Sequence, residues 1–189
     1  MSNSKGESKM SVPLYESVRR KFRRNRSEAE IVLSTVHIFS KLSRSEIRQV
    51  ENVMHVRHYT MNETIVKQGA PGSGMYIIVS GNVGIYILNH EHEEQLVTEL
   101  EKGDFFGEIA VLNDAPRTAT ARALENCTIL GFYRPDLLGL LETKPQIGIK
   151  ILLALSEVLA TRLSMTNEEL SRAQRQLQKL ENEHNDAGE

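Results

Sequence analysis

The chain has 189 residues, 40% of them hydrophobic, and a formal net charge of −2, so it can form one core of ordinary size and carries no overall charge that would attract nucleic acid or an anionic membrane. Its one cysteine, Cys127, excludes an internal disulfide and is typical of a reducing compartment. The N-terminus has no apolar signal core and no run approaches ~18 apolar residues, which predicts a soluble, cytoplasmic protein without secretion or a membrane span.

The first segment, 1–26, is polar, and six of the eight residues in 19–26 are basic. We predict that this segment is flexible and contains a short basic helix at 14–26. Its charges are typical of a solvated or partner-docking face. Contact with nucleic acid or an anionic membrane is the alternative.

Two capping patterns precede the region of predicted strands. Ser27 followed by Glu30 is a capping box, which predicts a helix that continues through Val36. Ser43 followed by Glu46 predicts a second short helix in the same way.

From residue 55 onward the apolar residues alternate with a period of two, which is typical of half-buried strands. Gly69 and Gly81 stand between such segments, where they would form tight turns. Many short antiparallel strands joined by such turns predict a mainly β protein of the α+β class, with a jelly-roll β-barrel. The predicted strands are 55–59, 63–67, 74–79, 83–88, 94–100, 117–123 and 128–132.

Residues 103–119 read GDFFGEIAVLNDAPRTA, and their order indicates an anion site. Arg117 stays charged at physiological pH, and its planar fork of donors fits a phosphodiester. Residues 109–112 can form one helical turn whose N–H groups would point at the same anion. Glu108 would repel a phosphate and is suited to a ribose hydroxyl, with Gly107 permitting close backbone approach. A surface ion pair between Glu108 and Arg117 in a hairpin loop is the alternative.

This segment resembles the phosphate-binding cassette of the cyclic nucleotide-binding domain family, which includes catabolite activator proteins and protein kinase A regulatory subunits. The region from Gly69 to Val83 and the helical entry at 36–47 are also similar to that family. The resemblance implies the cyclic nucleotide-binding fold and a cyclic nucleotide as ligand. The cassette residues that it implies for ligand binding are Phe106, Gly107, Glu108, Ile109, Ala110, Arg117, Thr118 and Ala119.

The period returns to helical after the last predicted strand. Pro135 suits the first turn of a helix through Leu141, and a long helix is predicted from 146 to 183. Two heptad series on it predict a two-stranded coiled coil and therefore a homodimer through 149–180. A helix packed only on its own barrel explains 147–160 but not the leucines that follow. The two series are Ile149, Ser156, Leu163, Leu170, Leu177 and Leu152, Leu159, Thr166, Ala173, Leu180.

The same helix resembles the dimer helix of the catabolite-activator branch of the family at Arg162, Thr166 and Asn167. By that resemblance these three residues would lie near the base of the nucleotide. The alternative for Thr166 is that the coiled coil tolerates a polar residue at this position. Upstream, Val97 and Thr98 are candidates to line the pocket. Thr118 is similar to residues in cassettes for cyclic GMP and for cyclic AMP alike, and the helix match favours cyclic AMP.

Two other functional classes compete with this interpretation. His90 and His92 match the opening of the cupin metal motif, but the expected glutamate position holds Leu96 or Val97 and no barrel histidine follows. A transcription factor would need a helix-turn-helix module, whereas only a coiled coil and an acidic tail follow the barrel, so direct DNA binding is not expected.

The sequence therefore predicts three parts: a flexible basic segment at 1–26, a cyclic nucleotide-binding domain at 27–145, and a dimerisation helix with an acidic tail at 146–189. We expect a receptor for cyclic AMP, or else cyclic GMP, that has no catalytic residues, no metal and no further cofactor. Its output would pass to an unknown partner protein through movement of the C-terminal helix.

Overall fold

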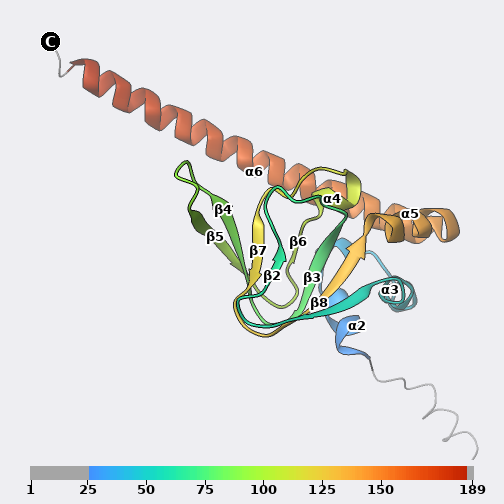
Figure 1. Ribbon diagram of the computed structural model, residues 1–189. Coiled ribbons are helices and arrows are strands. Elements are labelled where there is room, and N and C mark those ends of the chain that lie inside the picture. The colour runs from blue at the N-terminus through green and yellow to red at the C-terminus, as the bar shows by residue number, and fades with distance from the viewer. Residues whose placement is uncertain (1–25, 187–189) are drawn as a thin grey trace, which may run out of the picture.

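The computed structural model describes residues 26–186, so the basic segment through residue 25 and most of the helix predicted in it lie outside the described part. Three short helices come first: α2 (Glu28–Leu33), the 3-10 helix η1 (His37–Phe39) and α3 (Arg44–Glu51). The strands follow, and the chain ends with α5 (Arg134–Thr143) and the long helix α6 (Pro145–Asp186) (Figure 1).

The capping residues define the starts of α2 and α3. Ser43 and Glu46 form the predicted capping box of α3. In α2, the Ser27 hydroxyl accepts a hydrogen bond from the Glu30 N–H at 2.8 Å, but the Glu30 carboxylate bonds Arg44 instead of the N-cap. The helix also ends at Leu33 and not at the predicted Val36. The hydroxyls of the two residues that follow Leu33 bond back to helix carbonyls, which favours termination there.

Two four-stranded antiparallel sheets form the barrel, in the orders β1-β8-β3-β6 and β2-β7-β4-β5. This arrangement confirms the predicted mainly β, jelly-roll fold. The strand predicted at 117–123 begins only at Thr120, because the preceding residues belong to the cassette loop, and the short strand at Phe105 was not predicted. The strands are β1 His55–Tyr59, β2 Thr64–Val66, β3 Gly74–Ser80, β4 Val83–Leu88, β5 Glu94–Leu100, β6 Phe105–Phe106, β7 Thr120–Ala123 and β8 Cys127–Tyr133.

Strand β3 separates two apolar clusters. Its alternate residues Tyr76 and Ile78 join a cluster that links the two sheets, whereas Met75 and Ile77 pack against the helices. The turn glycines Gly69 and Gly81 both have positive φ, as the sequence predicted.

Helix α6 has a packed half and an exposed half. Near its start, Ile147, Ile151 and Leu155 are buried against the N-terminal helices and α5. Farther along, the helix passes the barrel and then projects away from the sheets, as Figure 1 shows, and Leu163 and Leu170 on its outer side are exposed. Among the helices between residues 26 and 186, none combines the length and hydropathy that a bilayer crossing requires.

An ion pair fixes the packed half of α6 to α3. The Lys150 ammonium donates to the Glu46 carboxylate at 2.8 Å, and together with the Ser43 N–H it lowers the pKa of Glu46 from 4.5 to about 2. A carboxyl whose folded pKa lies below its unfolded pKa stabilises the protein above the unfolded value. That contribution is lost as the pH falls from about 4.5 toward 2.

We expect Lys150→Gln to lower the free energy of unfolding by about 1 kcal/mol at pH 6, because the half-exposed pair is partly screened by water. The difference between variant and wild type should fall to less than half at about pH 2, where Glu46 becomes protonated in the folded protein. Urea unfolding at both pH values measures this difference in unfolding free energy. Lys102→Gln, which breaks the exposed pair with Glu28, is the control and should change stability little at either pH. An equal loss of stability in Lys150→Gln at both pH values would contradict the assignment of the low Glu46 pKa to the ion pair with Lys150.

Candidate ligand-binding site

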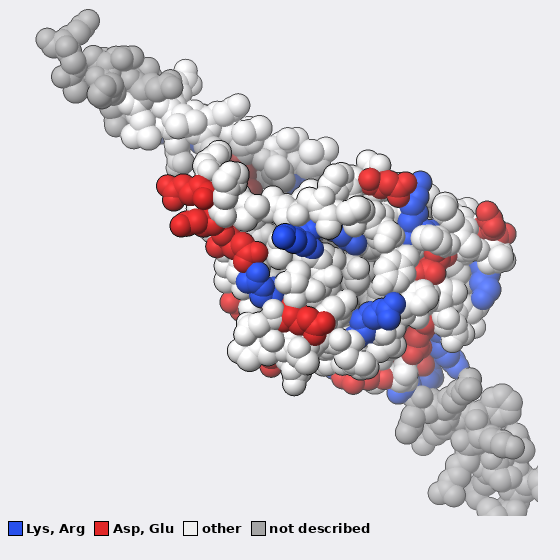
Figure 2. Space-filling view, in the orientation of Figure 1, with Lys and Arg blue, Asp and Glu red and all other residues white. Residues whose placement is uncertain are grey.

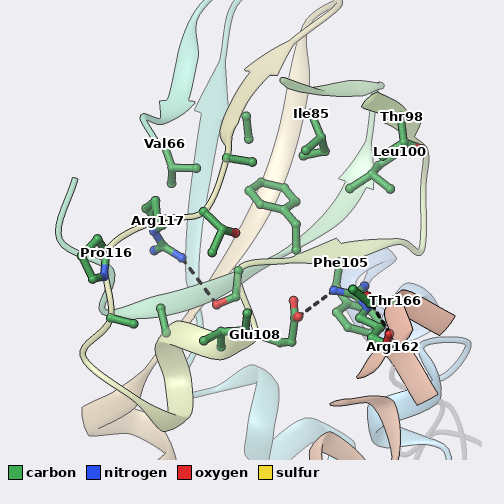
Figure 3. Close-up of a pocket in the computed structure, with 18 residues that line it drawn as sticks. Val66, Ile85, Thr98, Leu100, Phe105, Glu108, Pro116, Arg117, Arg162 and Thr166 are labelled. Carbon is green, nitrogen blue, oxygen red and sulfur yellow. Dashed lines mark hydrogen bonds and ion pairs between the residues drawn. The ribbon is translucent and has the colours of Figure 1, made fainter. Parts of the chain in front are cut away.

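A cavity of about 400 Å³ lies where the β2-β7-β4-β5 sheet, the connection from β6 to β7 and helix α6 meet (Figure 3). Most of the residues predicted from the cassette and the helix line it. Those predicted lining residues are Thr98, Phe106, Gly107, Glu108, Ile109, Ala110, Arg117, Thr118, Ala119, Arg162 and Thr166.

The Arg117 side chain lies at one end of this cavity and is buried, with 8% of the residue exposed. Its Nη1 donates to the carbonyl oxygen of Gly74 at 2.7 Å and approaches that of Gly107 at 3.4 Å. Gly107 has φ +78°, and a Cβ there would lie 2.5 Å from Arg117 Nη1. Glycine is therefore required at 107 to leave room for the guanidinium as well as for the backbone conformation.

Helix α4 (Ile109–Leu112) supplies the predicted single turn after Glu108. The N–H groups of Ala110 and Val111 already donate to the carbonyls of Gly107 and Glu108. Fewer of its N–H groups are thus available to an anion than the sequence predicted, because the turn is tight enough to bond to the residues that precede it.

Glu108 lies on the other side of the cassette and is almost fully buried. Its Oε1 is 2.6 Å from Nη1 of Arg162, and Figure 3 shows the two side chains pointing toward one another. The Arg162 guanidinium also lies 5.5 Å from the centroid of the Phe105 ring. An ionised carboxylate has about four acceptor sites, so Glu108 can bind Arg162 and still accept a hydroxyl.

Helix α6 contributes one face to the cavity. Arg162 and Thr166 are four residues apart and lie on the same side, whereas Asn167 is rotated by about 100° and does not line the cavity. The predicted place of Asn167 near the base, on a helix shared between two subunits, stays a prediction. The Thr166 hydroxyl donates to the Arg162 carbonyl at 3.0 Å, so the helix itself satisfies it.

The strands contribute mostly apolar side chains to the cavity. Thr98 and Leu100 line it, whereas Val97, whose side chain faces the opposite side of β5, does not. Sequence reasoning missed several lining residues, some of which lie in strands and others in the cassette loop. They are Val66, Ile85, Leu100, Phe105, Ala115, Pro116 and Ala121.

Comparison with known proteins places this site in a family. The family model described as "Cyclic nucleotide-binding domain" matches residues 56–144, which include the whole cassette. Residues 56–144 belong to the cyclic nucleotide-binding domain family.

The cyclic nucleotide-binding domain has relatives with several outputs. The chain is 38% identical over 100 residues to a cAMP-dependent protein kinase regulatory subunit of Mycosarcoma maydis, which covers 53% of this chain and 19% of that protein. It is 29% identical over 140 residues to a CRP-like cAMP-activated global transcriptional regulator of Mycobacterium tuberculosis, covering 74% of this chain and 61% of that protein.

Solved structures share the fold of this domain. The catabolite activator protein of Thermus thermophilus superposes with a TM-score of 0.66 at 28% identity, covering 71% of this chain and 61% of that one. The regulatory domain of Toxoplasma gondii PKA with cAMP gives a TM-score of 0.55 at 27% identity, covering 59% and 42%. The present chain thus spans from about a fifth to about three fifths of the relatives named here.

The family match stops before α6 begins. Arg162 and Thr166 lie beyond residue 144, so the family model covers the cassette and the barrel but not the helical wall of the cavity. The contact between Glu108 and Arg162 is therefore a feature of this chain's tertiary structure that the family match does not itself supply.

The two histidines of the alternative metal motif lie in a turn between strands. His90 and His92 lie at the tip of the β4–β5 hairpin, where exposed acidic side chains gather (Figure 2). Asn89 Oδ1 accepts hydrogen bonds from two backbone N–H groups of the tip, which identifies it as a solvated turn. Between residues 26 and 186, no group of three or more His, Cys, Asp or Glu side chains is arranged to hold a metal ion.

Proposed function

We propose that this protein is a receptor for a cyclic nucleotide, with cyclic AMP as the preferred ligand and cyclic GMP as the alternative. The observation that carries the proposal is the buried Arg117 guanidinium in a cavity whose lining is otherwise mostly apolar. A cyclic nucleotide matches this combination of charge and apolar surface, because its phosphodiester is anionic and its purine is largely apolar. Arg117 binds the phosphate in this proposal, and Gly107, Ala110 and Ala119 allow the close approach.

The remaining lining residues receive the sugar and the base. Glu108 accepts a hydrogen bond from the ribose 2′-hydroxyl while it retains Arg162. The purine lies against Val66, Ile85 and Leu100 and beneath the face of α6 that carries Thr166. The preference for cyclic AMP is supported by the names of the kinase subunit and the transcriptional regulator that this chain resembles.

Signal output in this proposal depends on α6, because one helix contributes both to the cavity and to the exposed surface. Arg162 links α6 to the cassette, so a ligand that occupies the cavity contacts both parts at once. A nucleotide shifts the position of α6 only by as much as its affinity differs between the two states. The receptor is non-catalytic, and a partner protein reads the position of the helix.

The exposed half of α6 supports a homodimer. Leu163, Leu170 and Leu177 are each more than half exposed on one side of a helix that no other described segment covers. A long amphipathic helix that is unsupported on its apolar side has little stability in water. A second copy that pairs along 149–180 buries these leucines in a coiled coil.

Isothermal titration of the purified protein with cyclic AMP, cyclic GMP and 5′-AMP tests the receptor function. We expect micromolar or tighter binding of cyclic AMP and weaker binding of cyclic GMP. We expect no measurable binding of 5′-AMP, whose phosphate is dianionic and not closed onto the ribose. Mass spectrometry of the denatured protein is the control, because nucleotide retained from expression would suppress the heat. No heat with a nucleotide-free protein would contradict the proposal.

A further inference from the structure

The Tyr76 ring contacts the Arg117 guanidinium from a side that does not line the cavity. The guanidinium carbon lies 5.4 Å from the centroid of the ring, within the range of a cation–π interaction. Tyr76 is in the middle of β3 and only 8% of it is exposed, so water screens this contact little. The inference drawn from this contact rests on the proposed receptor function.

Neighbouring aromatic rings hold Tyr76 in place. Phe106 pairs with Tyr76 across β3 and β6, and the two rings stack with centroids 5.3 Å apart. Tyr133 meets the Tyr76 ring edge-on at 6.3 Å. Gly131 is the partner of Tyr76 across β3 and β8, and a Cβ there would lie 2.8 Å from the Tyr133 hydroxyl oxygen. Glycine at 131 therefore leaves room for Tyr133, and we call Tyr76, Phe106 and Tyr133 the aromatic platform.

The groups that hold Arg117 are all uncharged. Within residues 26–186, no carboxylate forms an ion pair with Arg117, although the guanidinium is buried. Two backbone carbonyls and the face of the Tyr76 ring supply the negative potential instead. Burial raises the pKa of Tyr76, so its phenol stays neutral at physiological pH.

An uncharged support has a specific advantage for anion binding. A carboxylate in the place of the ring would neutralise the guanidinium and compete with an incoming phosphate. The carbonyls of Gly74 and Gly107 both contact Nη1, so they fix one corner of the guanidinium, and the ring adds a contact at the guanidinium carbon that limits rotation about that corner. Bidentate recognition of a phosphate requires the guanidinium plane to be oriented before the ligand arrives.

We propose that Tyr76 is a positioning residue for anion binding: its ring, held by the aromatic platform, orients the Arg117 guanidinium without neutralising it. The ligand class is a phosphate monoanion that Arg117 contacts, as in a cyclic nucleotide phosphodiester. Tyr76 itself contacts the arginine and not the ligand.

Titration of single variants with cyclic AMP is the first test. Tyr76→Leu keeps an apolar side chain in β3 but removes the ring, and we expect binding about 5- to 30-fold weaker, the range of a desolvated cation–π contact. Tyr76→Phe keeps the ring, and its affinity should stay within about twofold of wild type. Tyr86→Leu is the matched control, because Tyr86 contacts Arg122 in the same way, at 5.0 Å, and does not line the cavity. Equal losses for Tyr76→Leu and Tyr76→Phe would overturn the proposal.

A double-mutant cycle separates positioning from a general effect on the barrel. In an Arg117→Leu background, Tyr76→Leu should change the affinity for cyclic AMP by less than about twofold, because the group that it orients is gone. Competition against a fluorescent cyclic nucleotide at millimolar concentrations measures such weak binding. The same 5- to 30-fold loss in both backgrounds would show that Tyr76 acts through the fold, and would overturn the proposal.

A measurement on the ligand-free protein keeps this inference independent of the proposed function. The Arg117 Nε–H resonance should carry a ring-current shift from Tyr76, which Tyr76→Phe retains and Tyr76→Leu abolishes. Amide resonances of β3 and β8 report whether the barrel stays folded. An unchanged Arg117 resonance in folded Tyr76→Leu would overturn the proposal. Failure of the wild type to bind any nucleotide would instead contradict the receptor function. The resonance comparison on ligand-free protein would then still test the orientation of Arg117 by Tyr76.

Discussion

Replacing Arg117 with Leu is expected to weaken cyclic AMP binding by about 2–5 kcal/mol, the cost of removing one partner of a buried charge pair. The loss falls on the ligand because Arg117 is the buried cation of the cavity and its other contacts are to carbonyl oxygens. Isothermal titration or competition binding measures the change. The leucine also leaves the Gly74 carbonyl without this donor, so thermal unfolding should be recorded alongside the affinity.

Two further variants sharpen that experiment. Arg117→Lys keeps the positive charge but loses the planar fork, so its affinity should lie between those of Arg117→Leu and wild type. Arg122→Leu removes an arginine of β7 that pairs with Glu94 and does not line the cavity, and it should leave affinity unchanged. Wild-type affinity in a folded Arg117→Leu protein would remove the phosphate role of Arg117 and with it the proposed function.

The second large effect concerns the oligomeric state. Replacing Leu163 and Leu170 together with Glu is expected to convert a dimer into a monomer at micromolar concentration, as measured by multi-angle light scattering. Both leucines belong to the heptad series that starts at Ile149. Each is more than half exposed in the single chain. Four glutamates in one coiled-coil seam replace apolar burial by like-charge repulsion in a desolvated contact.

The control adds the same charge to the same turns of α6. Ser164 and Ser171 follow the two leucines directly and are exposed, so their replacement with Glu should leave the dimer intact. A persistent dimer in the Leu163/Leu170 variant would place the interface elsewhere on the molecule. A monomeric wild type would remove the homodimer proposal and leave the ligand-binding proposal untouched.

Local chemistry explains why much of the fold could be predicted. The capping box at Ser43 and the short turn after Glu108 each depend on residues only a few positions apart. Gly69 and Gly81 have the positive φ that their turns require. The cassette could be recognised for the same reason, since Gly107, Glu108 and Arg117 stand within one short connection.

The sequence could not decide the orientation of residues that depend on their neighbours in space. Val97 and Asn167 each stand beside a lining residue in the sequence, but neither lines the cavity of the single chain, because strand alternation turns one away and helix rotation turns the other. The end of α2 was misplaced, because hydroxyls after Leu33 and the contact of Glu30 with Arg44 replaced the continuation that the capping box predicted. The domain boundaries and the coiled coil stay predictions.

The sequence by itself determined the jelly-roll barrel, the cassette segment with its arginine and the long C-terminal helix, because their turns, strands and helices each follow from residues near one another in the chain. The tertiary structure alone decided which groups surround the charged residues of the site. Glu108 meets Arg162 from α6, and Arg117 meets the ring of Tyr76 from β3. Such contacts join segments far apart in the chain, and only the packing of both sheets against the helices brings them within interaction distance.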